Sequence, residues 1–460
     1  MEIIVCVPGI EGSRLSLHGE EVWPPTLEEL ITNYDRLQKI MDPAVVVTEI
    51  VKNVECFPIY QPLIDDLAEI AQRSGARAIE FPYDWRKNIV TEGATKLAQL
   101  IETQVAGGAT AVSLIAHSMG ALVVRHVLES GSYSNAPWFP KITRFVAICG
   151  PHLGAPTSLT KATGLEGTSG VSASDTKTFA ANPAYPSAYQ CLPVYGTYVL
   201  FDEVTQKWKN FYNHGVAQSL GLNLTNLDVA RASWDSIGLD KKPPNVSYYF
   251  ISGMGQKTEE VVELFASGQR SVYSDDDGDG TVPKWSADSP KVAHFSTPGD
   301  HIGILAAEPF RQILYRIFGQ VTVAAVRAAP KVLSIKVSVD RSVQTPGAPM
   351  NVLLIPEHPA ASLNGALRLE RGTERVLVSE TPINYQGQPI AQLRLELSAP
   401  RNYGAYVLSF VGTTHQTAAS RSAAFVVSRS ASAVQISPTI RFKPSAAGVE
   451  GLGREDENLP

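Results

Sequence analysis

The residues around Ser118 have the pattern of a catalytic serine at a sharp turn between a strand and a helix. An apolar run at residues 111–115 leads into Ala116, His117, Ser118, Met119 and Gly120, and residues 119–128 follow with helical spacing. Small residues two before and two after the serine let strand and helix pack closely, which exposes the hydroxyl above the sheet. An incidental serine in an ordinary turn is the alternative. The pattern predicts that Ser118 attacks an acyl carbonyl.

A serine of this kind needs donors that stabilise the oxyanion of the tetrahedral intermediate. The N–H of Met119 is a natural donor, because the helix after Ser118 has a partial positive charge at its N-terminus. A second donor is expected from residues 8–13, where two glycines allow close backbone approach. We expect the N–H of Glu11 in this role, with that of Ile10 as the alternative. A plain glycine-rich turn explains the segment alone equally well.

The serine also needs a base and an orienting acid, which follow it in the order Asp, His in α/β-hydrolases. Asp279 is predicted as the acid, because it lies in an acidic turn after a late strand. The same turn partly matches a calcium loop, but the twelfth position, which should be glutamate, is Ser286, so no metal site is predicted. His301, in a loop before a helix, is predicted as the base. The other candidates in chain order are His294, His358 and His415.

The order of elements up to about residue 320 predicts an α/β-hydrolase with a mostly parallel sheet. Strands separated by crossover helices form parallel sheets with helices on both faces. Two Pro- and Gly-rich stretches, residues 17–58 and 155–245, interrupt this rhythm and are predicted as cap or lid insertions, with peripheral decoration as the alternative. The expected strands are residues 3–7, 76–81, 111–115, 145–149 and 248–252, and the expected helices residues 63–73, 92–105 and 119–128.

After Pro330 the pattern changes to short, roughly alternating strands separated by Pro, Gly and Asn turns. About seven strands in about 100 residues predict an antiparallel β-sandwich, immunoglobulin-like, over residues 330–435. Residues 444–460 have little to bury and are expected to be disordered. The strands are expected at residues 332–339, 350–355, 367–370, 376–378, 392–397, 406–411 and 423–427.

The charge and the apolar content of the chain limit which kinds of binding partner are expected. The net charge is −6 without a basic stripe, so no nucleic-acid partner is expected, and a transient membrane-surface contact would be hydrophobic and local. No apolar run approaches the roughly 20 residues of a membrane-spanning helix. The first residues lack the pattern of a secretory signal, and the four cysteines show no close pairing. These features favour a cytoplasmic protein, with a processed secreted form as the alternative.

Several motifs, taken in order, make residues 1–320 resemble the lecithin:cholesterol acyltransferase family, which includes phospholipid:diacylglycerol acyltransferases and lysosomal phospholipase A2. The resemblance implies a triad of Ser118, Asp279 and His301 and an oxyanion hole in the loop after Gly9. It also implies cleavage of a glycerophospholipid acyl ester, with transfer of the acyl group to an alcohol or to water. The motifs are Val7-Pro8-Gly9-Ile10-Glu11-Gly12-Ser13-Arg14-Leu15, Val22-Trp23-Pro24, Tyr83-Asp84-Trp85-Arg86, Ala116-His117-Ser118-Met119-Gly120, Pro151-His152-Leu153-Gly154, Gly278-Asp279-Gly280-Thr281-Val282-Pro283 and Asp300-His301.

The chain departs from the family pattern in three ways. The lid disulfide of secreted members has no counterpart, because Cys56 is the single cysteine between residues 7 and 148. The predicted β-sandwich lies outside the family core. Glu11 stands where several members have an apolar residue beside the acyl pocket. Within the motifs, Asp84 and Arg86 are expected to form a buried ion pair, and Trp23 is expected either to gate the pocket or to pack.

The sequence therefore predicts a serine-dependent acyl-ester hydrolase or acyltransferase that acts on phospholipids without a cofactor. One alternative is a soluble esterase for small or non-lipid acyl substrates, whose long insertion builds a closed pocket. The other is a non-enzymatic, hydrolase-like binding module. The β-sandwich is a candidate site for a protein partner or a membrane surface, or a purely stabilising domain.

Overall fold

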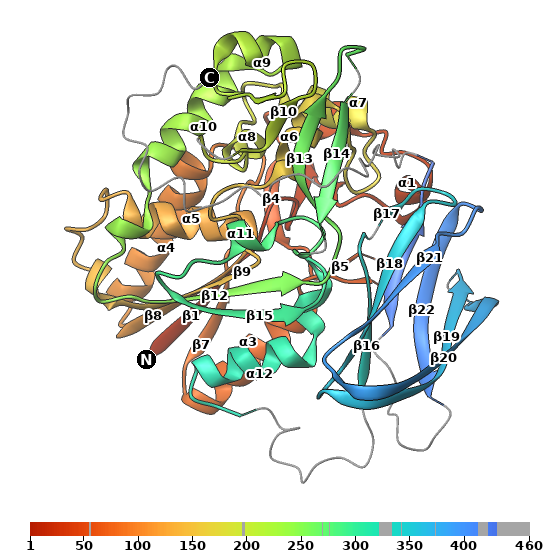
Figure 1. Cartoon of the computed structure of the whole chain (residues 1–460). Coiled ribbons are helices and arrows are strands. Elements are labelled where there is room, and N and C mark those ends of the chain that lie inside the picture. The colour runs from red at the N-terminus through yellow and green to blue at the C-terminus, as the bar shows by residue number, and fades with distance from the viewer. Residues whose placement is uncertain are drawn as a thin grey trace.

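The computed structural model describes residues 1–54, 57–195, 198–268, 270–275, 277–321, 334–341, 343–372, 374–412 and 422–429. Cys56, His415, the expected disordered tail and both ends of the predicted sandwich segment lie outside the described residues. Within them, a six-stranded sheet flanked by helices lies beside a two-sheet β-sandwich (Figure 1). The predicted fold class, a parallel α/β domain followed by an antiparallel β-sandwich, is confirmed, with one parallel strand pair in the sandwich.

The central sheet is parallel throughout, in the order β15-β12-β9-β8-β1-β7. In β1, residues 3, 5 and 7 pack against one helical layer and residues 4 and 6 against the other, as the period of two requires. Helices α4 (Thr95–Ala106) and α5 (Met119–Glu129) cover the first face, and α3 (Gln61–Ser74) and α12 (Glu308–Ile317) the second. The strands are β1 (Glu2–Val7), β7 (Arg77–Glu80), β8 (Ala111–His117), β9 (Ile142–Ile148), β12 (Ser247–Met254) and β15 (Ala293–Pro298).

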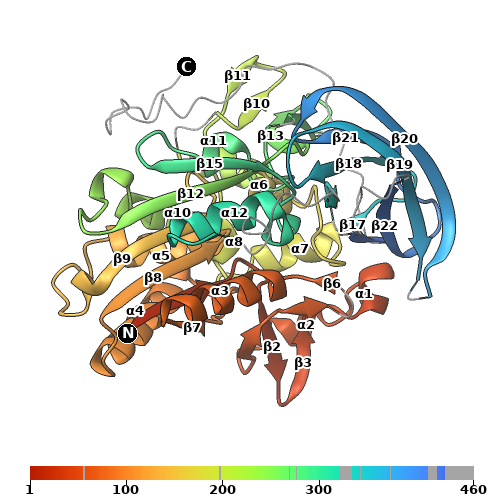
Figure 2. The same cartoon turned by 90° about the horizontal axis from the view of Figure 1, so that it is seen from below.

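Residues 17–58, here called the early insertion, fold largely into a small sheet and two short helices (Figure 2). Strand β2 (Ser13–Leu17) pairs with β3 (Glu20–Trp23) and β4 (Val46–Ile50), and α1 (Leu27–Ile31) and α2 (Leu37–Ile40) connect the last two. The segment ends in a short ribbon of β5 (Asn53–Val54) and β6 (Phe57–Pro58). These helices are too short to give a clear periodic signal in the sequence.

In its described residues, the long insertion (residues 155–245) contains five α-helices, a short 3₁₀ helix at Leu239–Lys241 and two short strands. The strands join a hairpin that the sequence did not predict, β13 (Thr258–Leu264) and β14 (Arg270–Asp275), in the order β11-β10-β13-β14. The insertion's elements are α6 (Pro156–Thr163), α7 (Ala173–Ala180), α8 (Ser187–Gln190), β10 (Leu200–Asp202), β11 (Lys207–Trp208), α9 (His214–Leu220) and α10 (Leu224–Ser236).

The sandwich packs a three-stranded sheet against a five-stranded sheet around one apolar core. The first contains β16 (Ile335–Val339), β18 (Pro349–Pro356) and β21 (Leu393–Ser398). The second, in order, contains β17 (Val343–Gln344), β23 (Ala423–Val427), β22 (Gly404–Gly412), β19 (Ala360–Arg371) and β20 (Val376–Ile390). All pairs are antiparallel except β17 with β23. The strands predicted at residues 367–370 and 376–378 are only the hairpin ends of the much longer β19 and β20.

The sandwich contacts the α/β part at several places. One is the turn after β12, where Arg394 donates to the carbonyl of Gly255 at 2.7 Å and Lys257 pairs with Glu396 at 3.1 Å. Another is the end of α1, where the Ser428 hydroxyl donates to the carbonyl of Ile31. Among the described residues, no helix has the length and apolar character to cross a membrane.

Candidate active site

Ser118 lies between β8 and α5 in a strained backbone conformation, with φ 54° and ψ −130°. This geometry is typical of a serine at the tip of a strand–turn–helix elbow. The turn leaves no room for larger residues, because a Cβ at Gly120 would lie 2.7 Å from the carbonyl oxygen of Val7. Ala116, the other small position, is fully buried. The small residues therefore serve the close packing that the motif requires.

The structure brings Ser118 together with His301 and Asp279. The Nε2 atom of His301 lies 2.9 Å from the Ser118 hydroxyl, and its Nδ1 atom lies 2.8 Å from Asp279 Oδ2. The other Asp279 carboxylate oxygen accepts the backbone N–H groups of Thr281 at 2.9 Å and Val282 at 2.7 Å. Burial by itself would raise the pKa of Asp279, but His301 and the N–H of Val282 outweigh it and lower the pKa. The carboxylate is thus held as an anion beside the imidazole.

The alternative histidines among the described residues lie outside this arrangement. His294 is exposed on the edge strand β15, where its ring contacts the carbonyl of Val292. His358 is exposed in the sandwich, in the turn between β18 and β19.

The predicted oxyanion-hole residues surround the serine. Met119 is the first residue of α5, so its N–H has no acceptor within the helix. The loop after β1 packs closely against Ser118, because a Cβ at Gly9 would lie 2.7 Å from the Cβ of Ser118. Ile10 and Glu11 both line the cavities that contain Ser118. The choice between their N–H groups as second donor stays a prediction.

Tyr60 and His117 form a buried chain of hydrogen bonds that links the loop after β1 to the backbone of His301. The N–H of Gly9 donates to the Tyr60 hydroxyl at 2.8 Å, and that hydroxyl lies 2.8 Å from Nδ1 of His117. Nε2 of His117 lies 2.9 Å from the backbone carbonyl of His301. Burial lowers the pKa of His117 to about 3, so the ring is neutral and donates from Nε2 to this carbonyl. Sequence reasoning missed Tyr60, which carries no local motif.

The side chain of Glu11 binds the long insertion. Its two carboxylate oxygens accept hydrogen bonds from the hydroxyls of Thr168 at 2.9 Å and Ser169 at 2.7 Å. Its backbone carbonyl accepts the indole N–H of Trp23 at 2.8 Å. The acidic residue that departs from the expected family pattern therefore connects the loop after β1 to both insertions.

Trp23 is buried and also lines the cavities beside Ser118. Its ring packs against Trp85, with centroids 5.2 Å apart, and against Tyr34, with centroids 5.8 Å apart. The indole is thus fixed from two sides while one part of it forms a wall of the pocket.

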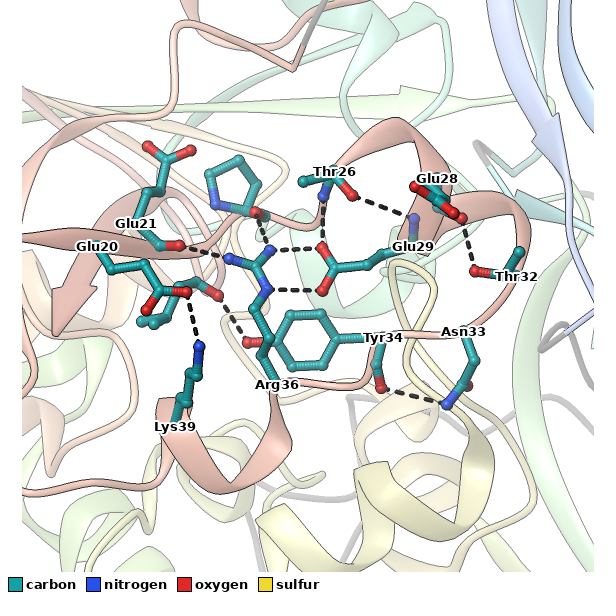
Figure 3. Close-up of polar contacts among 12 residues, drawn as sticks. Glu20, Glu21, Thr26, Glu28, Glu29, Thr32, Asn33, Tyr34, Arg36 and Lys39 are labelled. Atoms are coloured by element: carbon teal, nitrogen blue, oxygen red, sulfur yellow. Dashed lines mark hydrogen bonds and ion pairs between the residues drawn. The ribbon is translucent and has the colours of Figure 1, made fainter.

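Arg36 fixes the backbone on both sides of Trp23 (Figure 3). Its guanidinium forms a two-pronged ion pair with Glu29 and donates to the carbonyl oxygens of Glu21 and Pro24. Burial raises the pKa of Glu29, but the hydrogen bonds from Arg36 outweigh this and lower it overall. One side chain therefore holds α1 and the strand that carries Trp23 in a single arrangement.

The expected pair of Asp84 and Arg86 is present and buried, with its closest charged atoms 2.7 Å apart. Arg86 also donates to the carbonyl of Ile40 at the end of α2. The pair therefore connects the loop after β7 to the early insertion.

Two neighbouring cavities are both lined by Ser118. A largely apolar pocket of about 100 Å³ lies between the two insertions and is walled by residues such as Leu37, Trp85, Phe179 and Val282. A cleft of about 1220 Å³ runs outward from Ser118 and His301 along the sandwich, where Val339 and Phe425 line it. The arrangement is suited to hold an apolar acyl chain on one side of the serine and the remainder of a larger molecule on the other.

Comparison with known proteins supports the family that the sequence motifs indicate. Residues 48–241 match the family model of lecithin:cholesterol acyltransferase, which confirms the family resemblance; this segment contains Ser118 and ends before Asp279 and His301. A solved structure, phospholipase PlaB from Legionella pneumophila, aligns with 93% of this chain and 91% of its own, at 11% identity and a TM-score of 0.35. A search of curated proteins found no match.

Proposed function

We propose that this protein is a serine-dependent hydrolase or acyltransferase that acts on phospholipid acyl esters through an acyl-enzyme on Ser118. The observation that carries the proposal is the hydrogen-bonded chain from Ser118 through His301 to Asp279 at the mouth of an apolar pocket. The match to a lipid acyltransferase family supports the substrate class.

In the proposed reaction, His301 takes the proton from Ser118 through Nε2 as the hydroxyl oxygen attacks the ester carbonyl. Asp279 holds the ring in the tautomer that accepts this proton and stabilises the imidazolium. The N–H of Met119 and an N–H of the Glu11 loop stabilise the oxyanion. His301 then protonates the departing alcohol, and water or an acceptor alcohol attacks the acyl-enzyme with His301 again as base.

A second candidate, an esterase for short acyl chains, is favoured by one observation. The apolar pocket measures about 100 Å³, whereas pockets for drug-sized ligands span about 300–1,000 Å³. Under this alternative the substrate has a short acyl group, and the larger cleft beside Ser118 does not bind a lipid.

The test is to incubate the protein with mixed phospholipid vesicles, with and without a sterol or diacylglycerol, and to analyse the products by mass spectrometry. The comparison variants are Ser118→Ala and, as a matched control, Ser130→Ala at the far end of α5. Lysophospholipid with free fatty acid indicates hydrolysis, and new sterol or glycerol esters indicate transfer. Both should be lost in Ser118→Ala, by several orders of magnitude, and retained in Ser130→Ala. Turnover of short esters without any lipid product would favour the second candidate.

A further inference from the structure

Lys161 lies where the apolar pocket and the open cleft meet. It belongs to α6 of the long insertion and lines both spaces, as Ser118 does. Among the described residues, the other charged side chain that lines both is Glu11. The immediate electrostatic surroundings of a substrate at Ser118 therefore depend on these two groups.

Glu11 and Lys161 differ in how many of their hydrogen-bonding positions are already occupied. Both oxygens of Glu11 accept hydroxyl hydrogen bonds, from Thr168 and Ser169. The Lys161 ammonium donates to the same Thr168 hydroxyl at 3.2 Å, and in the described part of the chain no carboxylate lies within 4.0 Å of it. An ammonium has three donors, so two of them are available to a ligand.

Two arginines that line the cleft are already paired with carboxylates. Arg341 lies 2.7 Å from Glu166, and Arg311 lies 2.7 Å from Asp66. Lys161 is half-buried, and a cation removed from water without a counterion is unfavourable. An anionic group on the bound substrate would supply the missing charge.

We propose that Lys161 binds the phosphate of a glycerophospholipid head group. This rests on the proposed function and narrows it, because it selects phospholipids over neutral glycerides. In a glycerophospholipid the phosphate is attached to the same glycerol unit as the reacting ester. With the acyl chain in the apolar pocket and the carbonyl at Ser118, that unit occupies the junction where Lys161 lies. Lysine binds phosphate as a compact point charge, and a diacylglycerol offers only a hydroxyl at the same position.

The experiment compares dihexanoylphosphatidylcholine with dihexanoylglycerol, both as monomers below their aggregation limits, so that the acyl chains are identical. Lys161→Met keeps the length of the side chain and removes the charge, and Lys161→Arg keeps the charge. Lys177→Met, in α7 of the same insertion, is the matched control. In Lys161→Met we expect kcat/KM for the phospholipid to fall at least tenfold, mainly through KM, with less than a twofold change for the glyceride. Lys161→Arg should recover most of the loss.

The inference is overturned if the ratio of the two kcat/KM values, phospholipid to glyceride, is the same in Lys161→Met as in the wild type. This holds whether both values are retained or both fall equally. Retained turnover of the glyceride shows that the variant is folded, which separates binding from stability. A wild type that turns over p-nitrophenyl hexanoate but neither lipid overturns the proposed function itself.

Discussion

Ser338 of the β-sandwich donates a hydrogen bond to the carboxylate of Asp300, the residue immediately before His301. The same hydroxyl accepts a hydrogen bond from the Gln256 side chain at 3.3 Å. The backbone N–H of Gln256 in turn donates to the carbonyl of the residue before Asp279 at 3.0 Å. One side chain of the sandwich thus connects the loop of the proposed acid to the loop of the proposed base.

Replacing Ser338 with Ala should therefore lower kcat about tenfold and leave KM within about twofold, because small displacements of catalytic groups are costly. Steady-state kinetics on a soluble ester measure both constants. Ser362→Ala, at an exposed position of the same domain, is the control and should leave both unchanged. An unaltered kcat in Ser338→Ala would show that the sandwich does not position these loops.

Tyr60→Phe tests the buried chain of hydrogen bonds through Tyr60 and His117. Removal of the hydroxyl leaves the N–H of Gly9 and Nδ1 of His117 without their partners, and each unsatisfied group costs about 1–3 kcal/mol. We expect kcat to fall about 10- to 100-fold, because the proposed oxyanion loop and the proposed base His301 lose their common support. Tyr189→Phe removes another buried hydroxyl, which accepts from Asn223, and should retain activity. Equal losses in both variants would mean that the effect is general destabilisation.

Local sequence patterns predict the elements of the fold best where those elements are buried on both faces. The run at residues 3–7 is almost fully buried, so its apolar character predicts a central strand directly. The turn at Ser118 can be recognised in the sequence because its close packing requires small residues only two positions before and after the serine. Strand β20 shows the opposite case. It lies at a sheet edge and is mostly exposed, so no alternation of apolar residues reveals its full length.

The supporting parts of the site could not be predicted in this way. Tyr60 and His117 are 57 residues apart, and Ser338 and Asp300 are 38 residues apart. A hydrogen bond between such distant segments depends on tertiary packing and leaves no local pattern. The sequence identified Glu11 as unusual, but its partners Thr168 and Ser169 lie in an insertion without clear periodicity. Their contact became evident only from the folded chain.

Arg36→Met should loosen the segment that carries Trp23. The substitution leaves the Glu29 carboxylate and two backbone carbonyls without their shared donor. We expect faster limited proteolysis within residues 24–40 and a several-fold rise in KM for an acyl ester. Lys39→Met is the control, because its pair with Glu20 is exposed and exposed pairs contribute little to stability. The same proteolysis pattern in both variants would contradict the assigned role of Arg36.

Buried neutral histidines predict that the protein loses stability in acid. Burial lowers the pKa of His117 and of His126 from 6.5 to about 3. Below pH 6.5 the unfolded chain binds these protons and the native protein does not. The free energy of unfolding therefore decreases as the pH falls from about 6.5 towards 3, by up to about 1.4 kcal/mol per pH unit for each histidine. Glu259 acts in the opposite direction, because burial and the charge of Glu166 raise its pKa to about 7. The stability that this protonated carboxyl contributes is lost as the pH rises through 7.

His126→Gln isolates one of these contributions. Glutamine can keep hydrogen bonds to the hydroxyls of Ser233 and Ser236, which lie 2.8 Å and 3.2 Å from the His126 ring nitrogens, but it cannot take up a proton. Urea unfolding measured between pH 6 and pH 5 should give a slope of free energy against pH that is smaller in the variant. The expected difference is about 1 kcal/mol per pH unit, since most unfolded histidine is protonated across this range. Identical slopes in the variant and the wild type would show that His126 is already protonated in the native protein, contrary to its neutral, buried state.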